Sequence, residues 1–208
     1  MDALRGVEFV TSVADLSTLP PEQGAEVAFA GRSNAGKSSA LNALTQRQRM
    51  AFVSKTPGRT QLINFFRVGA DGFLVDLPGY GYAAVPDATR AKWESLVGGY
   101  LRTRECLRGV LLIMDARHPM KPLDYRFIEW LRPAGIPLHV LLSKCDKLSK
   151  AEAASTLQAV SAILNHEYDH CSVQLFSSLR KIGIVEAAAK IQEWLGRPDI
   201  KKPPVKGE

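Results

Sequence analysis

A glycine-rich octapeptide near the start of the chain has the residue types and spacing to bind a polyphosphate. Its residues are Gly31, Arg32, Ser33, Asn34, Ala35, Gly36, Lys37 and Ser38. They match the pattern G-x-x-x-x-G-K-[ST], in which the glycines let backbone N–H groups curl around phosphate oxygens without an obstructing Cβ. Lys37 would reach the terminal phosphates, and the Ser38 hydroxyl would take one position on Mg²⁺. The octapeptide therefore predicts a nucleotide-phosphate site.

The elements on either side of this loop have the order that phosphate binding requires. Residues 27–30 read as a short buried strand, and residues 39–44 read as an opening helix. The positive dipole end of that helix would point at the same phosphate oxygens.

Further along the chain, two residues are suited to the metal ion and the γ-phosphate. Asp76 ends a predicted hydrophobic strand at 72–76, where its carboxylate could hold Mg²⁺ through water. Gly79 leaves its backbone N–H free to approach a γ-phosphate oxygen. That contact would exist only with a nucleoside triphosphate.

The segment between these two motifs, residues 46–61, is long, basic and without periodicity. Loops of this length inside a compact domain are usually functional, and we predict a switch segment that the γ-phosphate and Mg²⁺ would order. Thr60 is the predicted second hydroxyl on the metal ion, with Thr56 as the alternative. An ordinary surface loop that contains threonines is the other interpretation.

A third motif follows the predicted buried strand at 136–142 and is suited to reading guanine. The carboxylate of Asp146 can accept hydrogen bonds from the N1–H and 2-amino groups of guanine, which adenine cannot supply, and the apolar stem of Lys144 can lie over the purine. Backbone N–H groups of Ser177, Ser178 and Leu179, at the end of a strand at 172–176, could meet guanine O6.

The remaining pattern alternates strands and helices, which predicts one α/β domain with no internal repeat. A hairpin turn at 69–72 joins the strands at 62–68 and 72–76. A further strand is predicted at 107–115, and helices are predicted at 87–104, 122–131, 147–165 and 182–195. Residues 7–19 are expected to form a short strand and turn at the domain edge.

The composition indicates a globular protein with a basic surface. The chain has 208 residues, 46% of them hydrophobic, and a net charge of +6. Between Val27 and Ala70 there is no acidic residue, which suggests a second polyanion such as RNA beside the nucleotide. A solvated basic face is the alternative. The basic residues of this stretch are Arg32, Lys37, Arg47, Arg49, Lys55, Arg59 and Arg67.

The cysteines and the chain's apolar runs favour a cytoplasmic location. Cys106, Cys145 and Cys171 form no C-x-x-C pair, so free thiols in a reducing compartment are expected. No apolar run approaches the length of a membrane span, and the first residues lack a signal-peptide pattern. His166 and His170 are spaced like metal ligands, but without a third ligand nearby they predict no metal site.

Taken together, the motifs resemble those of GTPases of the Era and TrmE class and, more closely, of the EngB family of bacterial GTP-binding proteins. The resemblance spans roughly residues 7–195. It is carried by the octapeptide, by Thr56–Gln61 (T-P-G-R-T-Q), by Asp76–Tyr82 (D-L-P-G-Y-G-Y) and by Phe176–Ser178. Ser143 departs from the family, which usually has Asn or Thr at that position.

This resemblance implies a single P-loop G domain with a mainly parallel six-stranded sheet, one antiparallel strand and helices on both faces. The domain would cover 25–196, preceded by an N-terminal extension at 1–24 that packs on it and followed by a flexible basic tail at 197–208. The resemblance also implies a role in assembly of the large ribosomal subunit, needed for normal cell division and septation.

The resemblance further implies which residues contact GTP or GDP and Mg²⁺. Mg²⁺ would bind Ser38 and Thr60. Besides the octapeptide, the implied nucleotide contacts are Gly58, Arg59, Thr60, Gln61, Leu62, Asp76, Leu77, Pro78, Gly79, Ser143, Lys144, Cys145, Asp146, Phe176, Ser177 and Ser178.

Hydrolysis is expected to use in-line attack of water on the γ-phosphate, with Lys37, Thr60 and Gly79 as the catalytic residues. Many G proteins have a glutamine after D-x-x-G to orient the water, whereas this chain has Tyr80. We therefore expect slow intrinsic hydrolysis that a partner or K⁺ accelerates. Asn34 resembles the K⁺-binding asparagine of cation-stimulated relatives, although it would also suit a tight turn.

Two other functions remain open at this stage. A GTP-dependent switch could act directly on a cell-division protein rather than on the ribosome. A metabolic P-loop kinase is the other, and the guanine signature of Asp146 argues against it.

Overall fold

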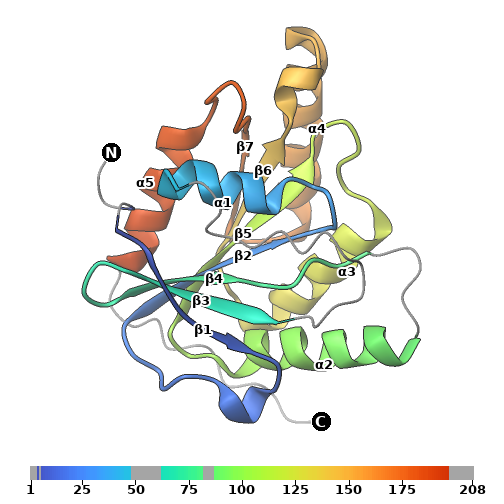
Figure 1. Cartoon of the computed structure of the whole chain (residues 1–208). Coiled ribbons are helices and arrows are strands. Elements are labelled where there is room, and N and C mark those ends of the chain that lie inside the picture. The colour runs from blue at the N-terminus through green and yellow to red at the C-terminus, as the bar shows by residue number, and fades with distance from the viewer. Residues whose placement is uncertain (1–3, 5, 48–61, 82–86, 197–208) are drawn as a thin grey trace.

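The computed structural model describes residues 4, 6–47, 62–81 and 87–196. Within these ranges the chain forms one twisted sheet with helices on both faces (Figure 1). The fold is a P-loop α/β fold, as predicted.

Seven strands form the sheet, in the order β1-β3-β4-β2-β5-β6-β7. Strand β3 runs antiparallel to both β1 and β4, and all other neighbouring pairs are parallel. The strands are β1 (Glu8–Val13), β2 (Ala25–Gly31), β3 (Ile63–Val68), β4 (Gly72–Asp76), β5 (Leu107–Asp115), β6 (Leu138–Ser143) and β7 (Cys171–Leu175). Because β4, β2, β5, β6 and β7 are parallel, their carboxyl ends share one edge of the sheet.

The helices divide between the two faces. Figure 1 shows α1 (Lys37–Thr45) beside α5 (Ile184–Leu195) on one face, and α2 (Asp87–Thr103) beside α3 (Pro122–Leu131) on the other. Helix α4 (Lys150–Glu167) packs mainly against β7. Short 3₁₀ turns complete the described chain: η1 (Leu16–Thr18), η2 (Arg132–Ala134) and η3 (Cys145–Lys147).

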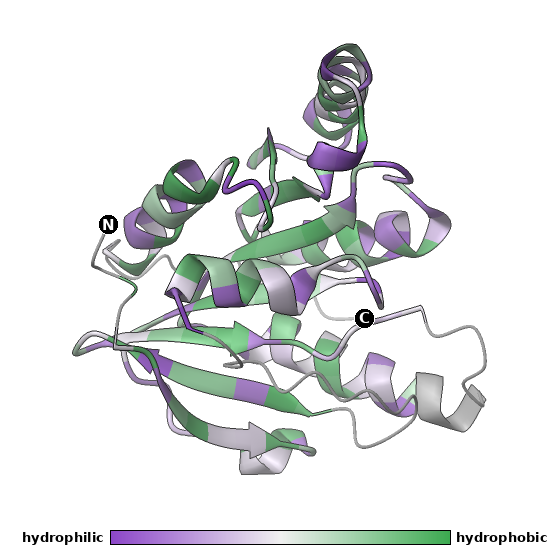
Figure 2. Ribbon diagram, turned by 45° about the horizontal axis from the view of Figure 1, so that its top comes forward, coloured by the Kyte–Doolittle hydropathy of each residue, from purple (hydrophilic) through white to green (hydrophobic). Residues whose placement is uncertain are grey.

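The central strands are buried on both faces, so their alternating side chains feed two separate cores. In β2, Ala28 and Ala30 face the core under α2 and α3, whereas Val27 and Phe29 face the core under α1 and α5. Continuous apolar runs of this kind are what a parallel strand covered by helices requires. Figure 2 shows the same pattern as hydrophobic central strands flanked by helices of mixed polarity.

Element boundaries differ from the sequence predictions where local hydrogen bonds decide them. The edge has a seventh strand because residues 8–13 pair with β3. Helix α4 begins at Lys150 rather than 147, because Ser149 and Glu152 form a reciprocal capping box. Helix α5 begins at Ile184 rather than 182, after Gly183 in the left-handed region.

Other sequence expectations concern thiols, metals and membranes. Cys106, Cys145 and Cys171 are all free. The described residues contain no group of three or more acidic, histidine or cysteine side chains arranged for a metal ion. None of the helices in the described ranges combines the length and the apolar character needed to cross a bilayer.

A buried ion pair ties the start of β2 to the end of α2. The guanidinium of Arg104 donates to both carboxylate oxygens of Glu26 at 2.5–3.0 Å, and the Tyr100 hydroxyl donates to the same carboxylate at 2.8 Å. Both charged side chains are nearly inaccessible, at 4% and 1% exposure. Arg104 also donates to the Pro20 carbonyl at 2.8 Å, so it anchors the segment that leads into β2.

Replacing Arg104 with methionine should destabilise the protein strongly. The substitution leaves the Glu26 carboxylate buried without its cation, which costs about 3–5 kcal/mol of unfolding free energy. Urea unfolding monitored by circular dichroism measures this change. The matched control is Arg132→Met, which breaks the exposed Arg132–Glu167 pair and should cost less than about 1 kcal/mol. Equal losses from both substitutions would contradict this account of the buried pair.

Candidate functional site

The predicted phosphate loop connects the carboxyl end of β2 to helix α1. Gly31 is the last residue of β2, Arg32, Ser33, Asn34, Ala35 and Gly36 form the loop, and Lys37 and Ser38 begin α1. Gly36 has φ +103°, in the left-handed region that favours glycine. No side chain of the described residues caps this helix end, so its first N–H groups suit a bound anion.

Lys37 and Asp76 meet between the loop and the end of β4. The Lys37 ammonium donates to the Asp76 carboxylate, and the two side chains are only 12% and 9% exposed. Because β2 and β4 are parallel neighbours, Asp76 lies opposite Phe29, two residues before the end of β2. The structure therefore places the predicted phosphate cation beside the predicted metal carboxylate.

The residues that follow Asp76 pair directly with the phosphate loop. Leu77 donates its N–H to the carbonyl of Phe29 at 3.0 Å, and Tyr80 donates to Gly31 at 3.3 Å. In return, the Ser33 N–H donates to the Tyr80 carbonyl at 2.8 Å. Pro78 and Gly79 lie between these contacts, and a Cβ added at Gly79 would be 3.5 Å from the Gly31 carbonyl oxygen.

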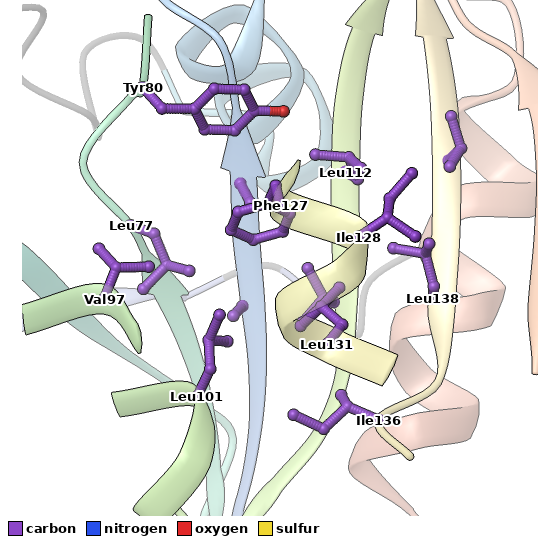
Figure 3. Close-up of a cluster of buried hydrophobic side chains, with 14 of the residues drawn as sticks. Leu77, Tyr80, Val97, Leu101, Leu112, Phe127, Ile128, Leu131, Ile136 and Leu138 are labelled. Atoms are coloured by element: carbon purple, nitrogen blue, oxygen red, sulfur yellow. The ribbon is translucent and has the colours of Figure 1, made fainter. Parts of the chain in front are cut away.

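Tyr80 points away from the phosphate loop, into the core under α3. Its ring stacks on Phe127 at 5.4 Å between centroids, and Figure 3 shows the two side chains next to each other in one hydrophobic cluster. Its hydroxyl donates to the buried carboxylate of Asp124 at 2.7 Å. Burial, with the nearby Asp124 carboxyl group, raises the pKa of Tyr80 well above its usual value. The phenol is thus a fixed structural group.

The predicted guanine motif lies on the other side of the loop, at the end of β6. Ser143 donates its hydroxyl to the Ala35 carbonyl, and Lys144 donates to the Asn34 carbonyl at 2.6 Å. Cys145 and Asp146 form the start of η3. Ser143 thus contacts the phosphate loop, although the family that the motifs resemble usually has Asn or Thr at this position.

Asp115, at the end of β5, is a site residue that the sequence analysis passed over. Its carboxylate accepts from Lys144 at 2.9 Å and from the Arg117 guanidinium at 2.7 and 2.9 Å. Burial opposes its ionisation most strongly, but the hydrogen bonds from Arg117 and Lys144 together hold the pKa of Asp115 well below its usual range. The sequence contained a signal for this position, because Asp115 is a carboxylate at the carboxyl end of a buried strand that was expected to be parallel.

The segment after β7 completes this end of the site. The Phe176 N–H donates to the Leu142 carbonyl at 2.9 Å, and the Ser177 hydroxyl donates to the Asp146 carboxylate at 2.5 Å. Ser178 follows in the same turn. Phe176 and Ser177 are therefore beside Asp146, although the motifs are 30 residues apart in sequence.

Several predicted contacts fall outside the described residues. These are Gly58, Arg59, Thr60 and Gln61, together with the alternative Thr56. Leu62, the last predicted contact of that segment, is described and directly precedes β3. The remaining predicted contacts lie at or just after the carboxyl ends of β2, β4, β6 and β7, with the loop at their centre.

Known proteins are similar to this chain over most of its length. The family model described as 50S ribosome-binding GTPase matches residues 26–144. A probable GTP-binding protein EngB of Aromatoleum aromaticum is 56% identical over 205 residues, covering 99% of this chain and 95% of that protein. The chain belongs to the EngB family of GTP-binding proteins. The family is one of GTPases, which agrees with the predicted nucleotide chemistry.

Solved structures support the fold. A crystal structure of a probable GTP-binding protein engB has a TM-score of 0.66 at 22% identity, covering 82% of this chain and 98% of that one. Era in complex with MgGDPNP and a segment of 16S ribosomal RNA has a TM-score of 0.62 at 22% identity, covering 87% of this chain and 60% of that one.

Asp146→Asn should change the preferred base from guanine to xanthine. The asparagine amide can donate to the 2-oxo group of xanthine, but it lacks the carboxylate that accepts from both guanine donors. Because hydrogen bonds to a charged group are worth about 1.5–3 kcal/mol each, GDP affinity should fall by about 100-fold or more. Competition of GDP and XDP against a fluorescent nucleotide measures the exchange. A variant that still prefers GDP would contradict the assignment of Asp146.

Proposed function

We propose that this chain is a Mg²⁺-dependent GTPase switch with slow intrinsic hydrolysis that acts in assembly of the large ribosomal subunit in the cytoplasm. The observation that carries the switch is the backbone pairing of Tyr80 with Gly31 and Ser33. Through it, the segment that contains Gly79 is attached to the loop that would hold the phosphates. Occupancy of the γ-phosphate position can therefore alter this segment directly.

The residues at the phosphate end fit Mg²⁺ and a triphosphate. Mg²⁺ prefers oxygen ligands, and few of them from protein when phosphates and water supply the others. Ser38 is the second residue of α1 and directly follows the lysine that contacts Asp76, so a hydroxyl and a carboxylate are near the phosphate cation. Ser38 and Thr60 would hold the ion, whose charge would stabilise the γ-phosphate oxygens.

The protein's own groups would bind the phosphates and polarise the γ-phosphate. Lys37 would leave Asp76 for the terminal phosphates, and the first N–H groups of α1 would face the same oxygens. Gly79 would donate its N–H to the γ-phosphate. In-line attack by water would follow.

The surroundings of Tyr80 support slow hydrolysis without help. A group that orients the attacking water must be able to turn toward it, whereas the Tyr80 hydroxyl is hydrogen-bonded to Asp124 and its ring is stacked on Phe127.

K⁺ is the proposed stimulant of hydrolysis, and the Asn34 side chain would hold it. Asn34 is exposed in the loop with φ +63°, and its carbonyl already accepts from Lys144.

The ribosome as partner rests on family and charge. The matching family model is described as ribosome-binding, and the net charge of +6 suits an RNA-rich surface. Among the described basic residues of the acid-free stretch, Arg47 and Arg67 are exposed, while Lys37 is committed to Asp76. A role in cell division and septation would follow from the need for ribosomes.

Sedimentation with ribosomal subunits tests the proposal. Bound to a non-hydrolysable GTP analogue, the protein should travel with the large subunit at least about fivefold more than with GDP. Higher salt should weaken the association, because basic side chains would release counterions from RNA.

A Gly79→Ala variant is a second test of the proposed switch. The added Cβ makes only ordinary contacts, 3.5 Å or more from its neighbours, so the protein should fold and bind GDP normally. It should nevertheless lose the preference for the GTP analogue in sedimentation, because the added Cβ would restrict the backbone rotation that brings the N–H of residue 79 to the γ-phosphate. For the wild-type protein, binding that is the same in both nucleotide states, or absent in both, would contradict the proposed switch on the large subunit and favour a division protein as the direct partner.

A further inference from the structure

The loop after β7, residues 176–183, is closed by its own backbone. Ser177 donates its N–H to the Ile182 carbonyl at 3.0 Å, and Ile182 donates to the Ser177 carbonyl at 3.1 Å. Its first half is bonded to Asp146 through Ser177, and its last residue, Gly183, is the N-cap of α5. Movement of Gly183 would therefore move the whole loop.

A side chain from β7 contacts this last residue. The Gln174 amide nitrogen donates to the Gly183 carbonyl at 2.7 Å and to the Leu175 carbonyl at 3.3 Å. A Cβ added at Gly183 would lie 2.4 Å from that nitrogen and 2.2 Å from the Leu175 oxygen. Only glycine fits there, so the loop backbone packs directly on the Gln174 amide.

The other end of the amide is held by a buried histidine. Backbone carbonyls can only accept, so the Gln174 amide must present its NH₂ group to Gly183 and its oxygen to His139. That oxygen is 2.8 Å from Nε2 of His139, which must therefore carry a hydrogen. Nδ1 of the neutral ring then accepts from the Ser172 hydroxyl at 2.7 Å.

The histidine is well placed to orient Gln174. His139 is 5% exposed on β6, and its ring meets Trp194 of α5 edge-on at 6.5 Å. Burial lowers the pKa of His139, which favours the neutral form that this hydrogen-bond pattern needs. Its register on β6 places it opposite Ser172, and Gln174 is the next residue on that side of β7.

We propose that Gln174, oriented by His139, is a positioning residue for guanine recognition. By holding Gly183, it fixes the loop whose backbone N–H groups at Ser178 and Leu179 would donate to guanine O6, because the Ser177 N–H already donates to Ile182. Loss of this hydrogen bond would let the loop retreat from the base. The inference rests on the guanine site proposed above, because the loop has a ligand only if that site binds guanine.

The test compares nucleotide affinities of the full-length wild-type protein and of Gln174→Met, which keeps the side-chain length without the amide. The probes are GDP, IDP, which keeps the 6-oxo group but lacks the 2-amino group, and 2-aminopurine riboside diphosphate, which lacks the 6-oxo group. Affinity for GDP and IDP should fall by roughly tenfold, the value of one well-made hydrogen bond, with little change for the third probe. Ser172→Ala, which leaves Gln174 on Gly183, should change none of the three by more than about twofold.

Three results would overturn the proposal. Equal weakening of all three nucleotides would make Gln174 a general support of the fold, and no weakening would make the contact irrelevant. ADP is the fourth probe, for the wild-type protein: if that protein does not prefer GDP to ADP, the guanine site itself fails together with this inference. Should Gln174→Met not fold, as its thermal unfolding will reveal, Gln174→Glu replaces it, because an ionised carboxylate cannot donate to Gly183 and should give the same pattern.

Discussion

The candidate site depends on the ion pair between Lys37 and Asp76. The two residues come from different elements, 39 positions apart, and both are nearly buried. Each needs the other, because a charge removed from water without a partner is costly. The Lys37 ammonium of this pair is also the group that a nucleotide's phosphates would require. On the proposed function, nucleotide binding would be an exchange of partners, in which phosphate would replace Asp76 at Lys37 and leave Asp76 available to the metal ion.

The sheet makes this exchange possible. Parallel neighbours bring the ends of β4, β2, β5 and β6 to one edge, so the phosphate loop contacts the segment after Asp76 on one side and Ser143 with Lys144 on the other. Tyr80 extends the first of these contacts to Asp124 at the start of α3. Lys144 extends the second to Asp115. Changes at the phosphates are thus connected to both the α3 side and the base side of the molecule.

The sequence was sufficient to predict an element or a site residue wherever the physical signal is local. The phosphate loop, Asp76 at the end of its strand and most helices were predicted, because glycine spacing, apolar runs and helical periodicity act over a few residues. Contacts that join distant segments were missed. Ser143 bonds a carbonyl in the phosphate loop, and Asp115 and Gln174 act through partners that only the folded sheet brings near. Strand β1 was expected as a short strand at the domain edge, but its membership of the sheet was missed, because its backbone pairs with β3, a segment distant in sequence. The start of α4 was an avoidable error, since the capping box of Ser149 and Glu152 is visible in the sequence.

The most direct test of the exchange of partners is the effect of Asp76→Asn on nucleotide affinity with and without Mg²⁺. In EDTA, the variant frees Lys37 from its competing carboxylate, so it should bind GDP as tightly as the wild-type protein or up to about tenfold more tightly. With Mg²⁺ present, it lacks the carboxylate for the metal ion and should bind a GTP analogue at least about tenfold more weakly. Isothermal titration calorimetry measures both. Equal weakening in the two conditions would contradict the account, because Asp76 would then support only the fold of the site.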